Sequence, residues 1–261
     1  MGEIGIITRD DSFGKSILRA LLVLEQFNSN VEIGIKELSI STGLPPSTIQ
    51  RIVNTLELKN YLTQNPKNNK YRLGIALYNI SKSFAEDLDW IEGAKMHMES
   101  LVNKHEETVN LAILQGRSIA YLKKVDSPHI LRPSFTVGTQ YPAICTALGK
   151  CILAFQPKEV VDRILATPLE KCTADTVTDP EELKEEFSKI RYNGYSTEDE
   201  QFQKGLYCIA TPIKDYKGKV IAAISMTIPK LRLEKESIPE IISDMIKTAN
   251  EISGDIMKTN P

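Results

Sequence analysis

Residues 42–56, Thr42-Gly43-Leu44-Pro45-Pro46-Ser47-Thr48-Ile49-Gln50-Arg51-Ile52-Val53-Asn54-Thr55-Leu56, form a glycine turn followed by a short helix with two distinct faces. The apolar residues recur at i, i+3, i+4 and i+7 and therefore share one face; they are Ile49, Ile52, Val53 and Leu56. The opposite face contains no acid, and its side chains are types that hydrogen-bond to phosphates and base edges; they are Ser47, Gln50, Arg51 and Asn54. We interpret this segment as a recognition helix for a DNA major groove.

The composition is that of a globular chain with room for two domains. It has 261 residues, of which 41% are hydrophobic and 25% charged, and this length allows two ordinary cores. The longest apolar run, 220–224, is too short to span a bilayer. The first residues carry acids where a signal peptide needs bases, and the four cysteines show no CxxC pairing. We therefore expect a cytoplasmic protein without a membrane segment.

The charge is unevenly distributed along the chain. The net charge is only -2, yet residues 38–75 carry five bases against one acid, Glu57. The bases in this segment are Arg51, Lys59, Lys67, Lys70 and Arg72. A basic patch on one small segment fits a DNA-reading module attached to a larger neutral body. The charges alone also fit an ordinary solvated surface.

The first 74 residues read as a winged helix-turn-helix. The first helix has Ile17, Leu21, Leu24 and Phe27 on one face, and a second helix over about 35–42 is anchored by Leu38. Gly43 can adopt the left-handed conformation that turns the chain into the next helix. Two short extended segments around 65–69 then make a hairpin, the wing.

This geometry assigns candidate DNA contacts. Ser47 and Thr48 begin the recognition helix, where phosphate or base contacts are favoured, and Gln50 and Arg51 are best placed to read base edges. The basic wing residues are expected to touch phosphate. The full set is Pro46, Ser47, Thr48, Gln50, Arg51, Asn54, Lys67, Lys70 and Arg72. The alternative is a structural helical bundle whose polar face has no function.

Residues 75–90 are predicted to form an amphipathic linker helix with Leu77, Ile80, Phe84 and Leu88 on one face. That face must be covered, either by the same helix of a partner chain or by the chain's own second domain. Residues 91–261 alternate helices and hairpins, with strands expected over 109–114, 119–125, 206–213 and 220–228. A helix is expected over 142–155, another is capped by Asp179, and a last one begins near Ser237. The fold class is α+β with a mainly antiparallel sheet.

The second domain shows no catalytic or metal-binding spacing. Gly149-Lys150 lacks the rest of a phosphate loop, and His97, His105 and His129 have no zinc spacing. Cys145 or Cys208 could be a nucleophile, but a lone cysteine is more often a small buried hydrophobe. The acidic run 198–200 could hold a cation, though such runs are usually solvated loops.

One strand does predict a small-molecule pocket. Ser225 and Thr227 alternate with Ile224, Met226 and Ile228, so both hydroxyl groups lie on one side of the strand. A strand that directs hydroxyl groups inward lines something polar, and a few convergent polar groups are what a ligand site needs.

Five segments together resemble the IclR family of bacterial transcriptional regulators. They are Ser16-Ile17-Leu18-Arg19-Ala20-Leu21, Thr42-Gly43-Leu44-Pro45-Pro46-Ser47-Thr48, Tyr71-Arg72-Leu73-Gly74, Thr146-Ala147-Leu148-Gly149-Lys150 and residues 205–213. The resemblance spans nearly the whole chain. It implies a winged helix-turn-helix (1–74), a linker helix (75–90) and a GAF-like effector domain (91–261).

The resemblance also implies partners and site residues. Family members are homodimers, often dimers of dimers, that bind a double-stranded operator and control catabolic genes in response to small organic, aromatic or sugar acids. The effector contacts implied here are Ala147, Leu148, Glu198, Cys208, Ser225 and Thr227, with Ile130 and Pro133 at an apolar lid. Glu198 stands where the family more often has Asp, and Thr227 where Ser is common. Each change is about one methylene, enough to change ligand preference about ten-fold.

We therefore predict a ligand-responsive, sequence-specific DNA-binding regulator, acting as a repressor, with no catalytic activity, cofactor or metal. The alternative is a metal-bound sensor or an enzyme with a DNA-binding appendage. In that alternative, folding would bring Cys145, Cys208 and Glu198 together around a soft metal ion.

Overall fold

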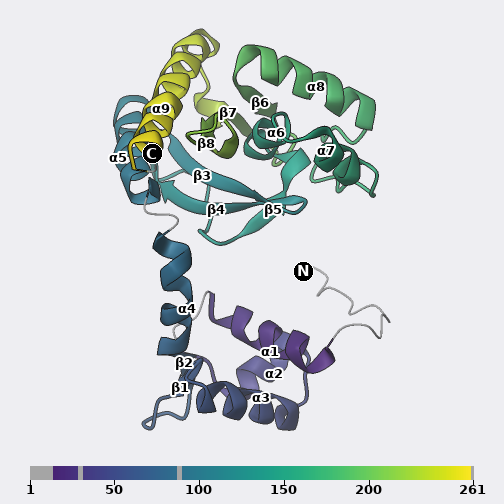
Figure 1. The fold of residues 1–261 in the computed structure, drawn as a ribbon, viewed down its shortest axis with the longest axis vertical. Coiled ribbons are helices and arrows are strands. Elements are labelled where there is room, and N and C mark those ends of the chain that lie inside the picture. The colour runs from purple at the N-terminus through teal and green to yellow at the C-terminus, as the bar shows by residue number, and fades with distance from the viewer. Residues whose placement is uncertain (1–13, 29–31, 87–89, 260–261) are drawn as a thin grey trace. The chain divides into compact units, whose positions relative to one another are not determined.

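The computed structural model describes residues 14–28, 32–86 and 90–259. The chain forms two compact units, Met1–Asp87 and Leu88–Pro261, and each is described by itself (Figure 1). Every helix in the described ranges is too short or too polar to traverse a lipid bilayer. The finer division into 1–74, 75–90 and 91–261 stays a prediction.

The first unit is the predicted winged helix-turn-helix. Its elements are α1 (Lys15–Glu25), a 3-10 turn (Gln26–Asn28), α2 (Ile35–Thr42), α3 (Pro46–Leu58), β1 (Leu62–Gln64), β2 (Tyr71–Leu73) and α4 (Ile75–Glu86). Strands β1 and β2 pair antiparallel as the wing, and an isolated bridge adds Ile33 to Tyr71. The buried core joins all these parts except α4; its members are Val23, Phe27, Ile33, Leu38, Ile49, Val53, Leu62 and Tyr71.

The turn between α2 and α3 is held by side chains as well as by glycine. Gly43 has φ +69°, the left-handed conformation that glycine adopts without a steric penalty. The Thr42 hydroxyl donates to the carbonyl oxygen of Leu38 at 2.6 Å, and the Ser39 hydroxyl donates to that of Leu44 at 2.6 Å. Pro46 occupies the first turn of α3, where its missing N–H costs nothing. These contacts fix the direction in which α3 leaves the turn.

Two apolar faces are less covered than their patterns suggest. In α1, Val23 is fully buried, whereas Ile17 and Leu21 are 68% and 49% exposed. In α4, Leu77 is half-buried, whereas Ile80 is 57% exposed. The side chain of Phe84 and the whole of Leu88 lie outside the described residues.

The second unit is a six-stranded antiparallel sheet between two layers of helices (Figure 1). Its strands are β3 (Thr108–Gln115), β4 (Ser118–Val125), β5 (Gln140–Pro142), β6 (Ser196–Asp199), β7 (Leu206–Lys214) and β8 (Val220–Pro229). They lie in the order β5-β4-β3-β8-β7-β6. Because side chains alternate along each strand, the two faces bury two separate cores. The mainly antiparallel sheet is confirmed.

Each core belongs to its own set of helices. One face packs against α5 (Trp90–His105) and α9 (Ile238–Thr259), where Met245 and Ile252 are buried as predicted. The other face packs against a 3-10 turn (Ala143–Cys145), α6 (Ala147–Leu153), α7 (Lys158–Leu165) and α8 (Pro180–Asn193). Asp179 caps α8, because its Oδ1 accepts from the backbone N–H groups of Glu181 at 3.0 Å and Glu182 at 2.9 Å.

Two sequence predictions in this unit are wrong. The single helix over 142–155 is divided by Thr146, which has an extended backbone and caps α6 by accepting from the Gly149 N–H at 3.0 Å. The acidic run is not a solvated loop, since Glu198 and Asp199 end β6 and Glu198 is 1% exposed. Edge pairing with β7 overrides the polar composition of this segment.

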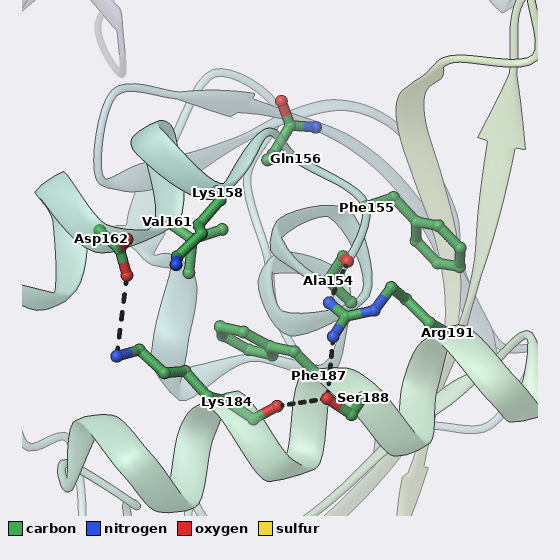
Figure 2. A pocket seen from close by; sticks show the side chains of 10 residues that line it. All are labelled: Ala154, Phe155, Gln156, Lys158, Val161, Asp162, Lys184, Phe187, Ser188 and Arg191. Atoms are coloured by element: carbon green, nitrogen blue, oxygen red, sulfur yellow. Dashed lines mark hydrogen bonds and ion pairs between the residues drawn. The ribbon is translucent and has the colours of Figure 1, made fainter.

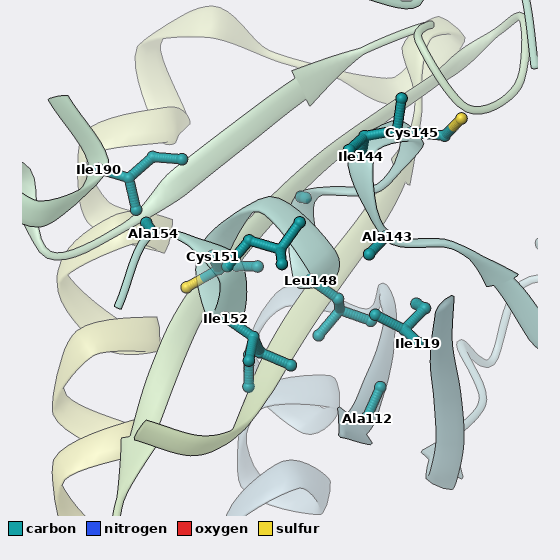
Figure 3. Packing of buried hydrophobic residues seen from close by; sticks show 14 of the residues in the cluster. Ala112, Ile119, Ala143, Ile144, Cys145, Leu148, Cys151, Ile152, Ala154 and Ile190 are labelled. Atoms are coloured by element: carbon teal, nitrogen blue, oxygen red, sulfur yellow. The ribbon is translucent and has the colours of Figure 1, made fainter. Parts of the chain in front are cut away.

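The close approach of α6 to the preceding 3-10 turn requires glycine at position 149. A Cβ there would lie 2.1 Å from the carbonyl oxygen of Ala143, and every residue of α6 is buried, with apolar side chains packed around the helix (Figure 3). We expect Gly149→Ala to lower the free energy of unfolding by about 1–3 kcal/mol through overpacking. The measurement is the urea midpoint of the full-length protein followed by circular dichroism.

The matched control is Gly93→Ala in α5, where a Cβ would meet nothing within 4 Å. Because alanine favours a helix over glycine, this variant should gain about 0.5–1 kcal/mol or stay unchanged. Equal midpoints for the two variants would contradict the packing argument.

Candidate functional site

The outer face of α3 is free of packing within its unit. Ile49 and Val53 are fully buried, while Gln50, Arg51 and Asn54 are exposed. The Gln50 Nε2 donates to the Asn54 Oδ1 at 2.7 Å, an i,i+4 pair that orders both amides on the helix surface. Ser47 is also exposed, and Thr48 is half-buried. The two faces expected from the sequence are therefore present.

The basic residues of the wing are not equivalent. Lys67 and Arg72 are exposed, whereas the Lys70 Nζ lies 2.9 Å from the Glu37 Oε1 of α2. The backbone N–H of Gly34 and then Lys70 lower the pKa of Glu37, so this carboxylate stays charged. Asn65 and Asn68 both donate to Glu32. Lys70 thus ties the wing to α2, and its charge is partly neutralised.

In the second unit, strand register places polar side chains in a row across one sheet face. Directly opposite residues in an antiparallel ladder lie on the same face. The ladders pair Ser225 with Ala210, Thr227 with Cys208, and Cys208 with Glu198. These side chains face α6 rather than α9, because Cys208 and Ala210 belong to the α6 core. The inward hydroxyl groups expected from the alternation in 224–228 are found.

A small, largely buried cavity lies between this row and the start of α6. Its lining residues are Tyr121, Phe135, Thr146, Ala147, Leu148, Glu198, Phe202, Cys208, Ser225 and Thr227. The cavity volume is about 10 Å³, about enough for one water and far below the ~300–1,000 Å³ of common ligand sites. Aromatic rings cover it, with Tyr121 stacked on Phe135 at 5.3 Å and Phe202 against Tyr141 at 4.9 Å between ring centroids.

Six of the eight effector residues implied by the resemblance meet here. They are Ala147, Leu148, Glu198, Cys208, Ser225 and Thr227. Ile130 is fully exposed and Pro133 half-buried, and neither lines the cavity; Phe135 supplies the apolar cover instead. Sequence reasoning missed Tyr121, Phe135 and Phe202, because an aromatic residue in a strand or loop gives no periodic signal of the cavity that it covers.

Burial controls the charge state of the cavity. Burial raises the pKa of Glu198 above its ordinary value. The backbone N–H of Phe202 donates to its Oε1 at 2.7 Å and has a smaller, opposite effect on this pKa. The Glu198 Oε2 is buried without a hydrogen-bond partner among the described residues. Burial also raises the pKa of the Cys208 thiol well above its usual range, so Cys208 is a neutral thiol and a poor nucleophile.

The segment that carries Phe202 is anchored by buried polar contacts. Lys150 in α6 is fully buried, and its Nζ lies 2.9 Å from each carboxylate oxygen of Glu186 in α8. The same Nζ donates to the side-chain oxygen of Gln201. The Thr176 hydroxyl donates to the carbonyl oxygen of Gln201 at 2.6 Å. Lys150 therefore has a structural role rather than the phosphate-binding role excluded from the sequence.

A larger hollow of about 590 Å³ lies elsewhere, between α7 and α8 (Figure 2). Two of its three cationic side chains, Arg191 and Lys184, are already engaged. Arg191 donates to the carbonyl oxygen of Ala154 and to the Ser188 hydroxyl, both at 2.8 Å. Lys184 is paired with Glu181 at 2.8 Å. The size of this hollow is therefore no indication of a binding site.

The metal-site alternative finds no support in the arrangement of its residues. Cys208 and Glu198 line the cavity, whereas Cys145 lies outside it and donates to the carbonyl oxygen of Glu170 at 3.4 Å. Within the ranges that the structure describes, no three His, Cys, Asp or Glu side chains form a group suited to a metal ion.

A winged helix-turn-helix joined to a domain with a buried polar cavity defines the class of ligand-responsive DNA-binding regulators. Residues 16–66 match the IclR helix-turn-helix domain, and residues 83–254 match the bacterial transcriptional regulator IclR C-terminal family. The chain belongs to the IclR family of transcriptional regulators. This confirms the resemblance noted from the sequence.

Relatives match over nearly their whole lengths. The HTH-type transcriptional regulator KdgR of Escherichia coli (strain K12) is 32% identical over 239 residues, covering 91% of each chain. The transcriptional repressor IclR of the same organism is 29% identical over 243 residues, covering 92% of this chain and 89% of the relative. Among solved structures, an IclR homolog complexed with 4-hydroxybenzoate from Microbacterium hydrocarbonoxydans is 26% identical, with a TM-score of 0.79 over 92% of this chain and 98% of that one.

The raised pKa of Glu198 predicts how stability depends on pH. Above the ordinary value of 4.5, the unfolded chain releases a proton that the folded protein retains, so stability falls as pH rises through this window. Glu198→Gln stays neutral and keeps an oxygen for the Phe202 N–H. We expect its melting temperature to exceed that of the wild type at pH about 8, with the gain vanishing at pH about 4.

The control is Glu200→Gln in the same segment. The Gly205 N–H lowers the pKa of Glu200, so its carboxylate stabilises the fold above the ordinary pKa and loses that effect as pH falls. This variant should lose stability at pH about 8. The same sign of change in both variants would refute the raised pKa of Glu198.

Proposed function

We propose that the protein is a homodimeric repressor of catabolic genes that reads an operator with α3 and the wing and is controlled by a small organic acid in the α6 cavity. The observation that carries this proposal is the convergence of Glu198, Cys208 and Thr227, from three different strands, on one buried polar cavity. Such convergence of polar groups is what a ligand site requires. The protein acts in the cytoplasm and catalyses no reaction.

The chemistry of α3 supports reading of base edges in the major groove. Glutamine pairs in bidentate fashion with adenine, and arginine with guanine, and Gln50 and Arg51 are exposed next to each other. Pro46, Ser47 and Thr48 at the start of α3 are placed for phosphate contacts. Lys67 and Arg72 extend the contact to the flanking backbone. Lys70 contributes less, because it is paired with Glu37.

The exposed apolar residues of the first unit support a dimer. Ile17 and Leu21 in α1 and Ile75 and Tyr78 in α4 are each between 49% and 68% exposed, and a second copy of the chain is an economical cover for them. Pairs of such dimers can associate further. An effector that favours one arrangement of the dimer changes the spacing of the two α3 helices and hence the affinity for a two-part operator.

The nature of the effector follows from the cavity and from one relative. The 4-hydroxybenzoate bound by the Microbacterium homolog is a small organic acid, and the hydroxyl groups of Ser225 and Thr227 suit a carboxylate. Because the cavity is only about 10 Å³, the effector must open it by moving the aromatic cover. This opening is the conformational change that we assign to regulation.

Arg51 tests the reading of bases. Arg51→Ala should lower the affinity for the operator by about ten-fold or more while leaving affinity for random DNA nearly unchanged, because a bidentate contact to guanine discriminates by about 1–3 kcal/mol. The measurement is a gel-shift titration with operator and scrambled duplexes. Unchanged operator affinity would refute the groove assignment.

Lys67 supplies the contrasting variant. Lys67→Ala should weaken binding to both duplexes alike and reduce the slope of log affinity against log salt by about one. A loss restricted to the operator would show that the wing reads sequence rather than phosphate.

Ser225 tests the cavity. Ser225→Ala should abolish release of the operator by effector while sparing operator binding itself, because the hydroxyl group lies in the cavity and not on α3.

A thermal-shift screen of small organic acids identifies the effector for this test, since a ligand of the native state raises the melting temperature. Full effector affinity of this variant in calorimetry would refute the cavity as the site.

A further inference from the structure

One buried polar residue beside the cavity has no role in the sites described so far. Asn110 in β3 is fully buried, and the β3–β8 ladder pairs it with Ser225, so its side chain lies on the cavity face. Its Nδ2 donates to the Thr227 hydroxyl at 3.4 Å. Its Oδ1 has no hydrogen-bond partner among the residues that the structure describes.

The surrounding sheet does not supply the missing donor. Strand β3 is paired on both sides, with β4 and with β8, so the backbone N–H groups beside Asn110 are used in the ladders. A buried amide oxygen without a donor is unfavourable. A group that enters through the cavity is therefore the available partner for Oδ1.

Glu198 presents a second buried oxygen of the same kind. Its Oε1 accepts from the Phe202 N–H at 2.7 Å, while within the described part of the chain its Oε2 has no hydrogen-bond partner. Glu198 lies on β6 and Asn110 on β3, with β8 and β7 between them. Three strand spacings amount to about 14 Å between backbones, so one hydroxyl group cannot reach both oxygens.

The Thr227 hydroxyl provides the complementary donor. Its oxygen accepts from the Asn110 Nδ2 at 3.4 Å and from the Cys208 Sγ at 3.6 Å. With both acceptor positions engaged, its own proton is left to donate. The cavity face thus offers a donor for a carboxylate between two acceptors for hydroxyl groups.

We propose that Asn110 is a specificity-determining residue of the effector site, and that the effector is an organic acid bearing at least two hydroxyl groups. One hydroxyl group donates to the Asn110 Oδ1 and another to the Glu198 Oε2, while the carboxylate accepts from Thr227. This inference rests on the proposed function, because it assumes that the cavity is the effector site.

The experiment compares acids that differ in their hydroxyl groups on the full-length protein. Calorimetry measures the affinities of gluconate and hexanoate, and of glycerate and propionate. We expect a hydroxylated acid to bind more tightly than its plain counterpart. In Asn110→Leu, which has a similar volume but no acceptor, we expect the ratio of affinities within that pair to fall about ten-fold.

The control is Thr211→Val, which removes a buried hydroxyl group from the opposite sheet face, where Thr211 donates to the carbonyl oxygen of Met245 at 3.1 Å. It should leave the ratio unchanged, so a general effect of removing a buried polar group is excluded. Circular dichroism checks the fold of each variant, and Asn110→Ala replaces Asn110→Leu if the latter does not fold.

Three results overturn the inference: an unchanged ratio in the Asn110 variant, equal binding of plain and hydroxylated acids, or no binding of either hydroxylated acid. If 4-hydroxybenzoate releases the operator while gluconate and glycerate do not bind, the inference fails and the proposed function stands. If Asn110-dependent binding of gluconate or glycerate never alters operator affinity, the proposed function fails instead.

Discussion

The pairing of β7 with β8, with Cys208 opposite Thr227 and Ala210 opposite Ser225, is the constraint on which the effector domain depends. Because side chains alternate along a strand, a shift of one residue would turn every hydroxyl group toward α9 and every apolar neighbour toward α6. The register is strongly fixed, since Ile209, Ile224 and Met226 are fully buried on the α9 face. The apolar core on one face thus holds the polar row in place on the other.

Burying this polar row costs free energy, which packing elsewhere in the domain offsets. Two oxygens, on Asn110 and Glu198, are buried without partners in the described structure, and each such group costs about 1–3 kcal/mol. Extensive apolar packing around α6 and across the α9 face offsets this cost. A ligand that enters this cavity and satisfies these oxygens would remove that cost, and this links folding energetics to the proposed regulation.

The sequence by itself determined the elements whose pattern is local. The two faces of residues 46–58, the left-handed turn at Gly43 and the Asp179 cap of α8 depend on residues within one or two helical turns, so periodicity and capping chemistry suffice to find them. The hairpins after Gln115 and Lys214 follow from turn residues between alternating runs. Six cavity-lining residues were predicted to contact an effector. Alternation along one strand indicated Ser225 and Thr227, whereas the other four came from matched motifs rather than from a local pattern.

Only the tertiary structure decided which distant segments meet. It made Glu198 a buried strand residue because β6 pairs with β7, and it broke the segment 142–155 at Thr146 to admit the fully buried α6. It placed Phe135 rather than Ile130 over the cavity, and it tied Lys70 to Glu37. It also brought Asn110 beside Thr227, 117 residues away. Long-range pairing and burial set these contacts. The residue pattern of one strand or helix does not indicate which distant segment it will pack against.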